Sequence, residues 1–391
     1  MSASNARRFG PFAALSQERF PWSVLFLSLL LLGLGLTVVR SMAGVDELFQ
    51  RSDVDFGAHL QKVLLTAPLL LVGMSLPPRW LKQRTFLFYA LAILLLLAVP
   101  LIGEERNNAR RWIPTPVGFD LQPSEFAKLA VILALAKLGQ SRRLQRPGEW
   151  LAPAAVVGLP MLLVAAQPDL GTSLTLVPIA FGLAFLAGAS GRLLIGLVVS
   201  AAALAYCATE FEWVKEYQLR RIQTWVDTWD PTRLIELRSG PPFHVYQARV
   251  SIGNGGFAGT GLGQGMASTA AHLPERDCDS IFCVVAEEGG FLGATALVVL
   301  YLSLILLLLS HAGGQRDRYT RLVLAGIALY FAGHLFINTG VNLGLVPMTG
   351  LTLPLLSTGG SSLMVTFLAL GIALGLIARE EPALDPDSFG D

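Results

Sequence analysis

Long apolar runs dominate the pattern of positions along this chain. Two examples are Val24–Val39 and Ala296–Leu309, which contain no charged residue and are rich in Leu, Val and Ala. A bilayer-spanning helix needs about 20 mostly apolar residues, and repeated runs of this kind predict several such helices. The runs lack the apolar–polar alternation of a membrane β-barrel. The pattern therefore predicts an all-α polytopic membrane protein.

We expect ten membrane-spanning helices, with ends uncertain by a few residues. They lie at about 22–42, 60–77, 86–102, 124–140, 150–166, 171–188, 192–210, 280–309, 320–340 and 351–378. Proline and glycine occur in several of them, which membrane helices tolerate when neighbouring groups satisfy the freed backbone. No cleavable signal pattern precedes the first run, so we interpret it as a retained first helix.

Composition supports a membrane location and says little else. Hydrophobic residues make up 53% of the chain and charged residues only 15%, too few charges to cover the surface of a soluble fold. The net charge of +1 carries little information. The three cysteines (Cys207, Cys278 and Cys283) have no metal-ligand spacing and form no disulfide framework.

The distribution of basic residues sets the expected orientation, because Lys and Arg accumulate in cytoplasmic loops. With a cytoplasmic N-terminus, the inside segments hold Arg7, Arg8, Arg19, Arg79, Lys82, Arg84, Arg142, Arg143, Arg146, Arg316, Arg318 and Arg321. The first outside loop is acidic, with Asp46, Glu47, Asp53 and Asp55. With this orientation we expect both termini to be cytoplasmic, in a multi-pass membrane protein.

This orientation divides the chain into five parts. They are a cytoplasmic N-terminal segment (1–21), helices one to seven (22–210), an extracytoplasmic loop (211–279), helices eight to ten (280–378) and a cytoplasmic tail (379–391). A loop as long as 211–279 is usually functional or disordered. This one carries Trp213, Trp225, Trp229, Phe243 and Tyr246. Its first part is typical of an interfacial segment, and it is the leading candidate for a site.

A glycine-rich stretch within this loop, Gly253–Gly265, contains a chance match to a dinucleotide fingerprint. The strand that this fingerprint requires is missing, so we reject a nucleotide site. Two interpretations remain. The stretch is either a turn that needs positive φ angles or a backbone surface that a phosphate or sugar approaches closely.

Three carboxylates stand at or inside the start of the eighth predicted span. Asp279 lies at its outer boundary, where it either caps the helix or carries chemistry. Glu287 and Glu288 lie about two turns deeper in the apolar run. Ionisable residues at that depth are costly, so each one faces a cavity or pairs with an Arg or Lys across the bundle.

Further polar groups open the fourth span and the loop before it. Glu125 and Lys128 are three residues apart and share one helix face, as a structural ion pair or as substrate contacts. Arg110, Arg111 and Trp112 stand on the outside, against the usual charge rule. Arginine binds phosphate in a bidentate manner, so a pyrophosphate contact competes with simple snorkelling to headgroups.

Asp169 lies in a tight outside turn between the fifth and sixth predicted spans, where an aspartate is an ordinary turn former. The small polar stretches Asn338–Asn342 and Pro354–Ser362 are expected to serve close helix packing. Without a resemblance to known proteins, these residues do not separate an enzyme from a transporter.

Several motifs in order give the chain a specific resemblance. They are Asn108–Ile113, Gln122–Lys128, Gln167–Thr172, Gln247 with Ile252–Gly256, Leu273–Arg276 with Asp279 and Ile281–Phe282, Ala286–Glu288, Pro347–Gly350, and Leu353–Ser362. Together, over about residues 20–380, they resemble the SEDS family of bacterial shape, elongation, division and sporulation proteins, typified by RodA and FtsW.

The resemblance implies a peptidoglycan glycosyltransferase that polymerises lipid II on the outer face of the membrane, with a class B penicillin-binding transpeptidase as partner. It assigns the catalytic position to Asp279. It places Glu125, Lys128 and Asp169 in a central cavity. Gln247 and Glu275, which belong to two of the motifs, join them as expected substrate contacts, together with Arg110, Arg111 and Trp112.

Two positions resemble the elongation (RodA) branch of the family more than the division branch, namely Ala286 and Thr349. The chain also departs from the family pattern. Asp277–Cys278 replaces the usual His–Thr, Ala248 replaces a Ser, and Thr358 replaces a Tyr. The large loop is lengthened around Leu234 to Pro242. A carboxylate at Asp277 would raise an apparent pKa by like-charge coupling with Asp279.

The resulting mechanistic hypothesis makes Asp279 a general base on an acceptor sugar hydroxyl, with a polyprenyl pyrophosphate as leaving group. Arg110, Arg111 or a divalent cation (Mg or Mn) would stabilise the pyrophosphate. We expect no cofactor bound by a protein cage, and a metal held mainly by substrate phosphates. The alternatives are a lipid II flippase, which Glu125, Lys128, Glu287 and Glu288 would suit, a division-type polymerase, and a non-catalytic scaffold.

Overall fold

The computed structural model describes residues 20–51, 53–106, 109–115, 120–141, 144, 147–210, 223–230, 241–270 and 273–379. Several features singled out in the sequence lie outside these residues. They are Arg7, Arg8, Arg19, Asn108, Arg142, Arg143, Arg146, Trp213, most of the lengthened segment around Leu234, and the tail after residue 379.

The described part of the chain is mainly helical, and a helix or helix pair coincides with each predicted span. The helices are α2 (Trp22–Leu48), α3 (Phe56–Thr66), α4 (Pro68–Ser75), α5 (Pro78–Ile102), α6 (Pro123–Gly139), α7 (Leu151–Ala166), α8 (Leu170–Leu186), α9 (Gly191–Glu210), α14 (Ile281–Gly314), α15 (Arg318–Asn342) and α16 (Gly360–Ala378). Smaller elements are β1 (Glu104–Arg106), β2 (Ala109–Trp112), the 3₁₀ turn η2 (Pro147–Trp150), α12 (Pro241–Asn254) and α13 (Met266–Thr269).

Seven helical segments in the described residues are long and apolar enough to cross a membrane. They are Trp22–Leu48, Phe56–Ser75, Pro78–Ile102, Gly148–Ala166, Ile281–Gly314, Arg318–Asn342 and Gly360–Ala378. α8 and α9 contain shorter apolar stretches. The chain is therefore a polytopic helical membrane protein.

The expected tenth span, 351–378, was wrong in its first part, because α16 begins only at Gly360. Residues 351–359 are not helical, and their backbone groups bond to side chains instead. Asn338 Nδ2 donates to the Leu351 carbonyl at 2.7 Å, and Leu353 N donates to Ser357 Oγ at 2.9 Å. Irregular backbone is stable at membrane depth when protein groups satisfy it in this way.

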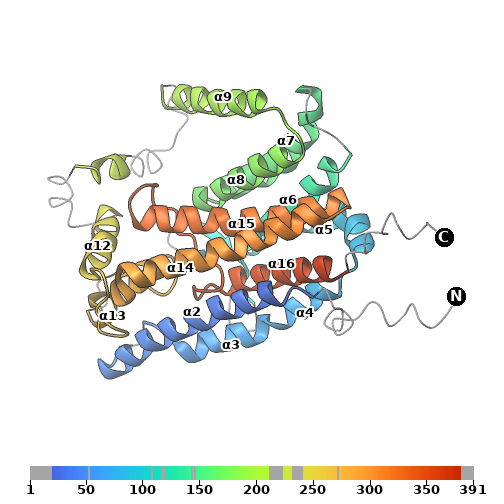
Figure 1. Ribbon diagram of the computed structural model, residues 1–391. Coiled ribbons are helices and arrows are strands. Elements are labelled where there is room, and N and C mark those ends of the chain that lie inside the picture. Colours follow the sequence, from blue (N-terminus) through green and yellow to red (C-terminus); the bar gives the residue numbers. More distant parts are fainter. Residues whose placement is uncertain are drawn as a thin grey trace.

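α14 and α15 run side by side through the middle of the bundle, with α2, α3, α4 and α16 on one side and α6, α7 and α8 on the other (Figure 1). α9 lies at the outer edge, and α12 and α13 cover one end. The core consists of α6, α15 and α16, most of whose residues are buried. Large apolar side chains on outer helices are exposed, as at Phe26 on α2 (65%), Leu94 on α5 (61%) and Phe185 on α8 (62%), which suits contact with lipid.

The two ends of the bundle differ in charge. At one end, Lys82 of α5 pairs with Asp317 at 3.2 Å, just before α15, and Arg318 Nη2 donates to the Ala187 carbonyl at 2.6 Å. Arg379 Nη1, after α16, donates to the Leu76 carbonyl at 3.0 Å at the same end. The two described segments that were predicted to be basic, around Lys82 and Arg318, therefore lie at one end, and α12 and α13 lie at the opposite end (Figure 1).

α14 is broken at Gly290, whose φ and ψ are 64° and −163°, and the glycine-rich stretch fills the break. Thr260 N and Gly261 N donate to the carbonyls of Glu287 and Glu288, both at 3.0 Å, and Phe291 N donates to the Gly256 carbonyl at 2.9 Å. The break would otherwise leave these backbone groups unsatisfied in the interior.

Glycine is required in this stretch because two backbones meet. A Cβ atom at Gly255 would lie 2.1 Å from the Ala286 carbonyl oxygen, and one at Gly259 would lie 2.1 Å from that of Glu288. The sequence suggested that a phosphate or sugar could lie close to the glycine backbone, but the backbone of α14 occupies that position. Of the two interpretations of the stretch, the structure favours a structural turn.

Candidate active site

Asp279 stands one residue before the N-cap of α14, which is Ser280. No side chain caps this helix end, so the capping alternative for Asp279 does not describe the structure. The contact of its carboxylate within the described residues is a long one, from Ser280 Oγ at 3.5 Å. Its Oδ2 atom faces Gly350, where a Cβ would stand 3.6 Å away. Asp279 thus presents a carboxylate with little structural use.

The surroundings of Asp279 raise its pKa to about 7. Removal from water is the main cause, and the negative charge of Glu275 is the next. Asp277 raises the pKa of Asp279 as well, in the direction that the sequence predicted, but it contributes less than Glu275. A carboxylate with a pKa near neutrality is suited to accept a proton from a hydroxyl group.

Side chains on α12 and α15 surround the segment that carries Asp279. His244 Nε2 lies 2.9 Å from Ser280 Oγ. Asn338 and Asn342, one turn apart on α15, both donate to the Asp279 carbonyl, at 2.9 and 3.1 Å. These asparagines were expected only to pack helices, and the structure gives them a second role in holding the backbone of the site.

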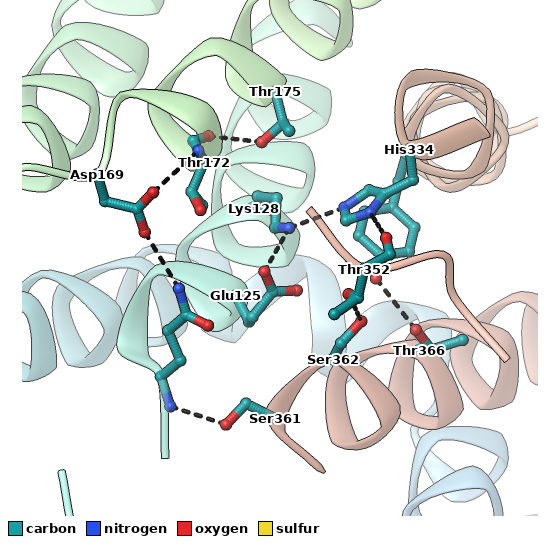
Figure 2. A network of polar contacts seen from close by, with 12 residues as sticks. Glu125, Lys128, Asp169, Thr172, Thr175, His334, Thr352, Ser361, Ser362 and Thr366 are labelled. Atoms are coloured by element: carbon teal, nitrogen blue, oxygen red, sulfur yellow. Dashed lines mark hydrogen bonds and ion pairs between the residues drawn. The ribbon is translucent and has the colours of Figure 1, made fainter. Parts of the chain in front are cut away.

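A second polar cluster lies inside the bundle, around the buried ion pair of α6. Lys128 Nζ is 2.7 Å from Glu125 Oε1 and 2.8 Å from His334 Nε2 (Figure 2). His334 Nδ1 is 2.9 Å from the Thr352 carbonyl, which can only accept. Nδ1 therefore carries the proton, and Nε2 accepts from the Lys128 ammonium. Glu125 Oε2 is buried without a hydrogen-bond partner.

Asp169 lies near this cluster (Figure 2). It is the N-cap of α8, where it accepts from Thr172 N at 3.2 Å, and its other oxygen accepts from Gln122 Nε2 at 3.1 Å (Figure 2). Arg111 approaches Asp169 with its Nη1 atom at 3.7 Å. Arg111 also donates to the carbonyls of Gln167 and Pro168. The guanidinium group therefore has protein partners on several sides.

The segment 349–352 joins the two clusters. Gly350 faces Asp279, and the Thr349 carbonyl packs on Gly171 of α8, where a Cβ would stand only 2.2 Å away. Thr352 bonds His334 through its carbonyl and Ser362 Oγ through its hydroxyl, at 2.9 Å each. Segment 349–352 therefore contacts both Asp279 and the residues that surround Glu125 and Lys128.

The other residues predicted for the site lie around these clusters. Glu275 has a φ of 47°; its surface is exposed, but nearby protein atoms remove part of its carboxylate's hydration, and this partial desolvation and the charge of Asp277 raise its pKa. Gln247 of α12 is 5% exposed, and its Oε1 atom has no partner. Arg110 is exposed on β2 and pairs with Glu105 at 3.5 Å, while Trp112 is half-buried on the same strand. The substrate contacts expected of these residues remain predictions.

Glu287 and Glu288 bond to α13 and its neighbours, and among the described residues neither forms a salt bridge with Arg or Lys, one of the two alternatives that the sequence left open. Glu287 accepts from the backbone of Met266 at 3.0 Å and of Ala267 at 2.8 Å, while Ser268 Oγ donates to Glu288. N–H and O–H donors thus bind both carboxylates at this depth, although Glu288 Oε2 has no hydrogen-bond partner among the described residues. Through these contacts, both glutamates hold the segment that directly follows the glycine-rich stretch and so help to fix that stretch in place.

Sequence reasoning missed His334, His244 and the pairing of Asp277 with Thr358, whose hydroxyl donates to Asp277 Oδ2 at 2.6 Å. His334 could have been found, since an ionisable residue inside a predicted span is a marker of a polar site. The described residues contain no group of three or more His, Cys, Asp or Glu side chains arranged to hold a metal ion.

Comparison with known proteins gives concordant matches. Residues 22–381 match the FtsW/RodA/SpoVE family, described as a cell cycle protein. The chain is 34% identical over 370 residues to a protein of Burkholderia thailandensis named "Probable peptidoglycan glycosyltransferase FtsW", covering 91% of this chain and 78% of the relative. It is 33% identical over 355 residues to "Peptidoglycan glycosyltransferase MrdB" of Escherichia coli, covering 89% and 92%.

Solved structures agree with these relatives. A chain from a structure described as "Structural coordination of polymerization and crosslinking by a peptidoglycan synthase complex" matches with a TM-score of 0.77 and 30% identity, over 96% of this chain and all of that one (100%). The rod shape determining protein RodA of Thermus thermophilus matches with a TM-score of 0.67 and 28% identity, over 96% and 99%. Because family, relatives and fold agree over nearly its whole length, this chain belongs to the FtsW/RodA/SpoVE family of cell cycle proteins.

Proposed function

We propose that this protein is a peptidoglycan glycosyltransferase that polymerises lipid II on the outer face of a bacterial cytoplasmic membrane, with Asp279 as its general base. The observation that carries the proposal is the carboxylate of Asp279. It has little structural use, a pKa raised to about 7, and a position at the end of the bundle opposite the basic segments.

In the proposed reaction, the Asp279 carboxylate takes the proton of an acceptor sugar hydroxyl as that oxygen attacks the anomeric carbon of the donor chain. The bond from this carbon to the pyrophosphate oxygen breaks, and polyprenyl pyrophosphate leaves with the bonding electrons. General-base assistance of this kind typically contributes ~10²–10⁴-fold to a rate. The leaving pyrophosphate supplies the driving force, so the reaction requires no nucleotide.

The orientation follows from the distribution of charge. Lys82, Arg318 and Arg379 gather at the end of the bundle away from α12 and α13, and basic ends of membrane proteins face the cytoplasm. All ten helical segments then cross the membrane, both chain ends are cytoplasmic, and residues 211–279 form an extracytoplasmic loop. Asp279 meets its substrate at the outer membrane surface.

Substrate contacts are proposed for Arg110, Arg111, Trp112, Glu125, Lys128, Asp169, Gln247 and Glu275. Lys128 supplies a buried positive charge, and the unpartnered oxygens of Glu125 and Gln247 can accept hydrogen bonds from sugar or peptide groups. Arg110, the more exposed of the two arginines, is the better candidate for the pyrophosphate. A divalent cation would arrive with that pyrophosphate and neutralise part of its charge.

The proposed partner is a class B penicillin-binding transpeptidase, because a chain of similar fold belongs to a peptidoglycan synthase complex that couples polymerisation and crosslinking. Ala286 and Thr349 favour a role in elongation and rod shape. Identities of 34% and 33% to an FtsW and to MrdB favour neither branch, so the elongation assignment depends on these two residues.

A lipid II flippase is the second candidate, favoured by the buried charges of Glu125 and Lys128 in the middle of the bundle. The test uses the purified protein with its transpeptidase partner and labelled lipid II in detergent, where no sealed bilayer exists. A polymerase makes glycan strands there, and Asp279→Ala abolishes them. A product that remains unpolymerised in detergent, together with transbilayer movement of lipid II in vesicles, would overturn the proposal.

A further inference from the structure

The segment Asp277–Asp279 belongs to no helix or strand and is held by its carbonyl groups. Thr358 N donates to the Asp277 carbonyl at 3.0 Å, and Ser357 Oγ donates to the Cys278 carbonyl. The Asp279 carbonyl accepts from Asn338 and Asn342. Three successive carbonyls are thus fixed, two by the turn before α16 and one by α15.

One bond between side chains adds to this set. Thr358 Oγ1 donates to Asp277 Oδ2 at 2.6 Å, and the same hydroxyl lies 3.3 Å from the Asp277 carbonyl. Thr358 is 7% exposed, so this bond is largely shielded from water. A short bond to an ionised carboxylate is among the stronger hydrogen bonds in proteins. Both residues were singled out in the sequence as departures from the family pattern, 81 residues apart.

We propose that Asp277 and Thr358 form a positioning pair that fixes the segment 277–279 against the turn before α16 and so directs the Asp279 carboxylate toward Gly350. This inference rests on Asp279 being the general base. Neither residue of the pair is assigned to the chemistry itself.

The geometry explains why the bond should affect catalysis. The Asp279 carboxylate has a weak contact of its own, from Ser280 at 3.5 Å. Its direction is therefore set by the backbone that carries it. A displacement of about 1 Å in a reacting group can lower a rate ~10²-fold. Loss of the pair should lower kcat, because Asp279 is misdirected, and leave KM nearly unchanged, because the lipid-binding surface stays in place.

A double-mutant cycle tests the pair, using the full chain with its transpeptidase partner and lipid II in detergent. The variants are Asp277→Ala, Thr358→Val, their combination, and Thr358→Ser. Rates are compared at about pH 8.5, above the pKa of about 7 that Asp279 has in the unmodified protein. Thr37→Val is the matched control, since Thr37 is exposed and its hydroxyl bonds the Gly33 carbonyl of its own helix, at 2.8 Å.

We expect each single variant to lower kcat about tenfold, the size expected for loss of a charge-assisted bond. The combination should lose about tenfold as well, not a hundredfold, because both changes remove the same interaction. Thr358→Ser, which keeps the hydroxyl, should restore kcat to within about twofold. Thermal unfolding of each variant in detergent separates misdirection from loss of fold.

The positioning role is contradicted if the decrease in kcat of the double variant equals the product of the two single decreases. It is also contradicted if Thr358→Ser is as slow as Thr358→Val. It also fails if the losses lie in KM alone. Asp279→Asn is assayed alongside: an active Asp279→Asn variant would overturn the proposed function, whereas an inactive one with an additive cycle would overturn the pair alone.

Discussion

Asp279 differs from the other carboxylates of the bundle in what its oxygens touch. Glu287 accepts two backbone N–H groups, and Asp169 accepts from Thr172 and Gln122. Glu125 is bound to Lys128 at 2.7 Å. The carboxylate of Asp279 has a raised pKa, and its contact with another side chain is a long one, from Ser280. Removing such a carboxylate from water destabilises the fold, and its few contacts do not offset this. Groups of this kind are typical of catalytic sites.

The pH dependence of the rate follows from the pKa of Asp279. The base is the ionised form, and its pKa is raised to about 7, so polymerisation should rise with pH through about 7 and fall away below it. Glu275→Gln removes the second-largest cause of this shift, so it should move the midpoint of the acid limb to lower pH. The pH–rate profile of each protein, under single-turnover conditions, measures the midpoint.

Glu47→Gln is the control for this experiment, because Glu47 is exposed and pairs with Arg40 at 3.1 Å on α2. Its profile should coincide with that of the unmodified protein. An acid limb that moved equally in both variants, or moved to higher pH in Glu275→Gln, would contradict the assignment of the limb to Asp279.

The sequence predicted several residues of the site, but it did not show which distant residues bond to one another. Asp279, Glu125 and Lys128 stand in recognisable motifs, and an ion pair three residues apart on a helix is predicted by geometry alone. Asp277 and Thr358 meet across 81 residues, at two positions that depart from the motifs, so no local pattern predicts their bond.

At the scale of elements, the break in α14 and the glycine-rich stretch form one unit. The stretch supplies backbone partners to Glu287, Glu288 and Phe291, which the helix break leaves without helical bonds. The sequence showed the glycines but not the surface that they approach, because that surface is backbone of a different segment. The same limit explains the tenth span. Residues 351–359 contain several leucines, and bonds from Asn338 of α15 and within the segment itself hold them in a non-helical form.

Two neighbouring glycines test the close backbone contact. Gly255→Ala places a Cβ 2.1 Å from the Ala286 carbonyl oxygen, whereas Gly253→Ala meets nothing within 4 Å. We expect Gly255→Ala to lower the free energy of unfolding by about 1–3 kcal/mol, the usual range for overpacking. Gly253→Ala should leave it unchanged or slightly raised, since Ala is the better helix former. Equal thermal unfolding midpoints in detergent would contradict the contact.

The buried pair on α6 allows stability and substrate binding to be separated. Glu125→Leu leaves the Lys128 ammonium, which is 0% exposed, without its carboxylate, and should cost about 3–5 kcal/mol of stability. Adding Lys128→Met removes the unpaired charge and should restore most of the unfolding midpoint. If both residues contact substrate, the stable double variant still polymerises at least about tenfold more slowly. Full activity of the double variant would assign the pair to the fold alone.

At the scale of the whole molecule, the approximate positions of the apolar helices were largely predictable, because the apolar length of a span follows from the energetics of the bilayer. The orientation expected from Lys and Arg stays a prediction. Each predicted span overlaps helical structure, although the tenth helix begins only at Gly360. The ends of the helices were less predictable. α2 continues to Leu48 and α5 begins at Pro78, since polar residues extend both helices beyond their apolar runs.

Orientation can be tested with single cysteines at the two ends of the bundle. Thr260 and Arg84 are both exposed, the former in the glycine-rich stretch and the latter on α5 near the basic end. A membrane-impermeant maleimide should label Thr260→Cys in spheroplasts and label Arg84→Cys only after the membrane is opened. The unsubstituted chain sets the background of its own cysteines. The reverse pattern would place Asp279 on the cytoplasmic side and remove it from an outer-face reaction.

The most direct test of the whole account is the rate at which Asp279→Asn, purified with its transpeptidase partner, converts labelled lipid II into glycan polymer. Asparagine keeps the shape of the side chain and removes the base. The account predicts a fall of at least ~10²-fold in this rate with an unchanged unfolding midpoint. A variant that polymerises lipid II at a rate close to that of the unmodified protein would contradict it.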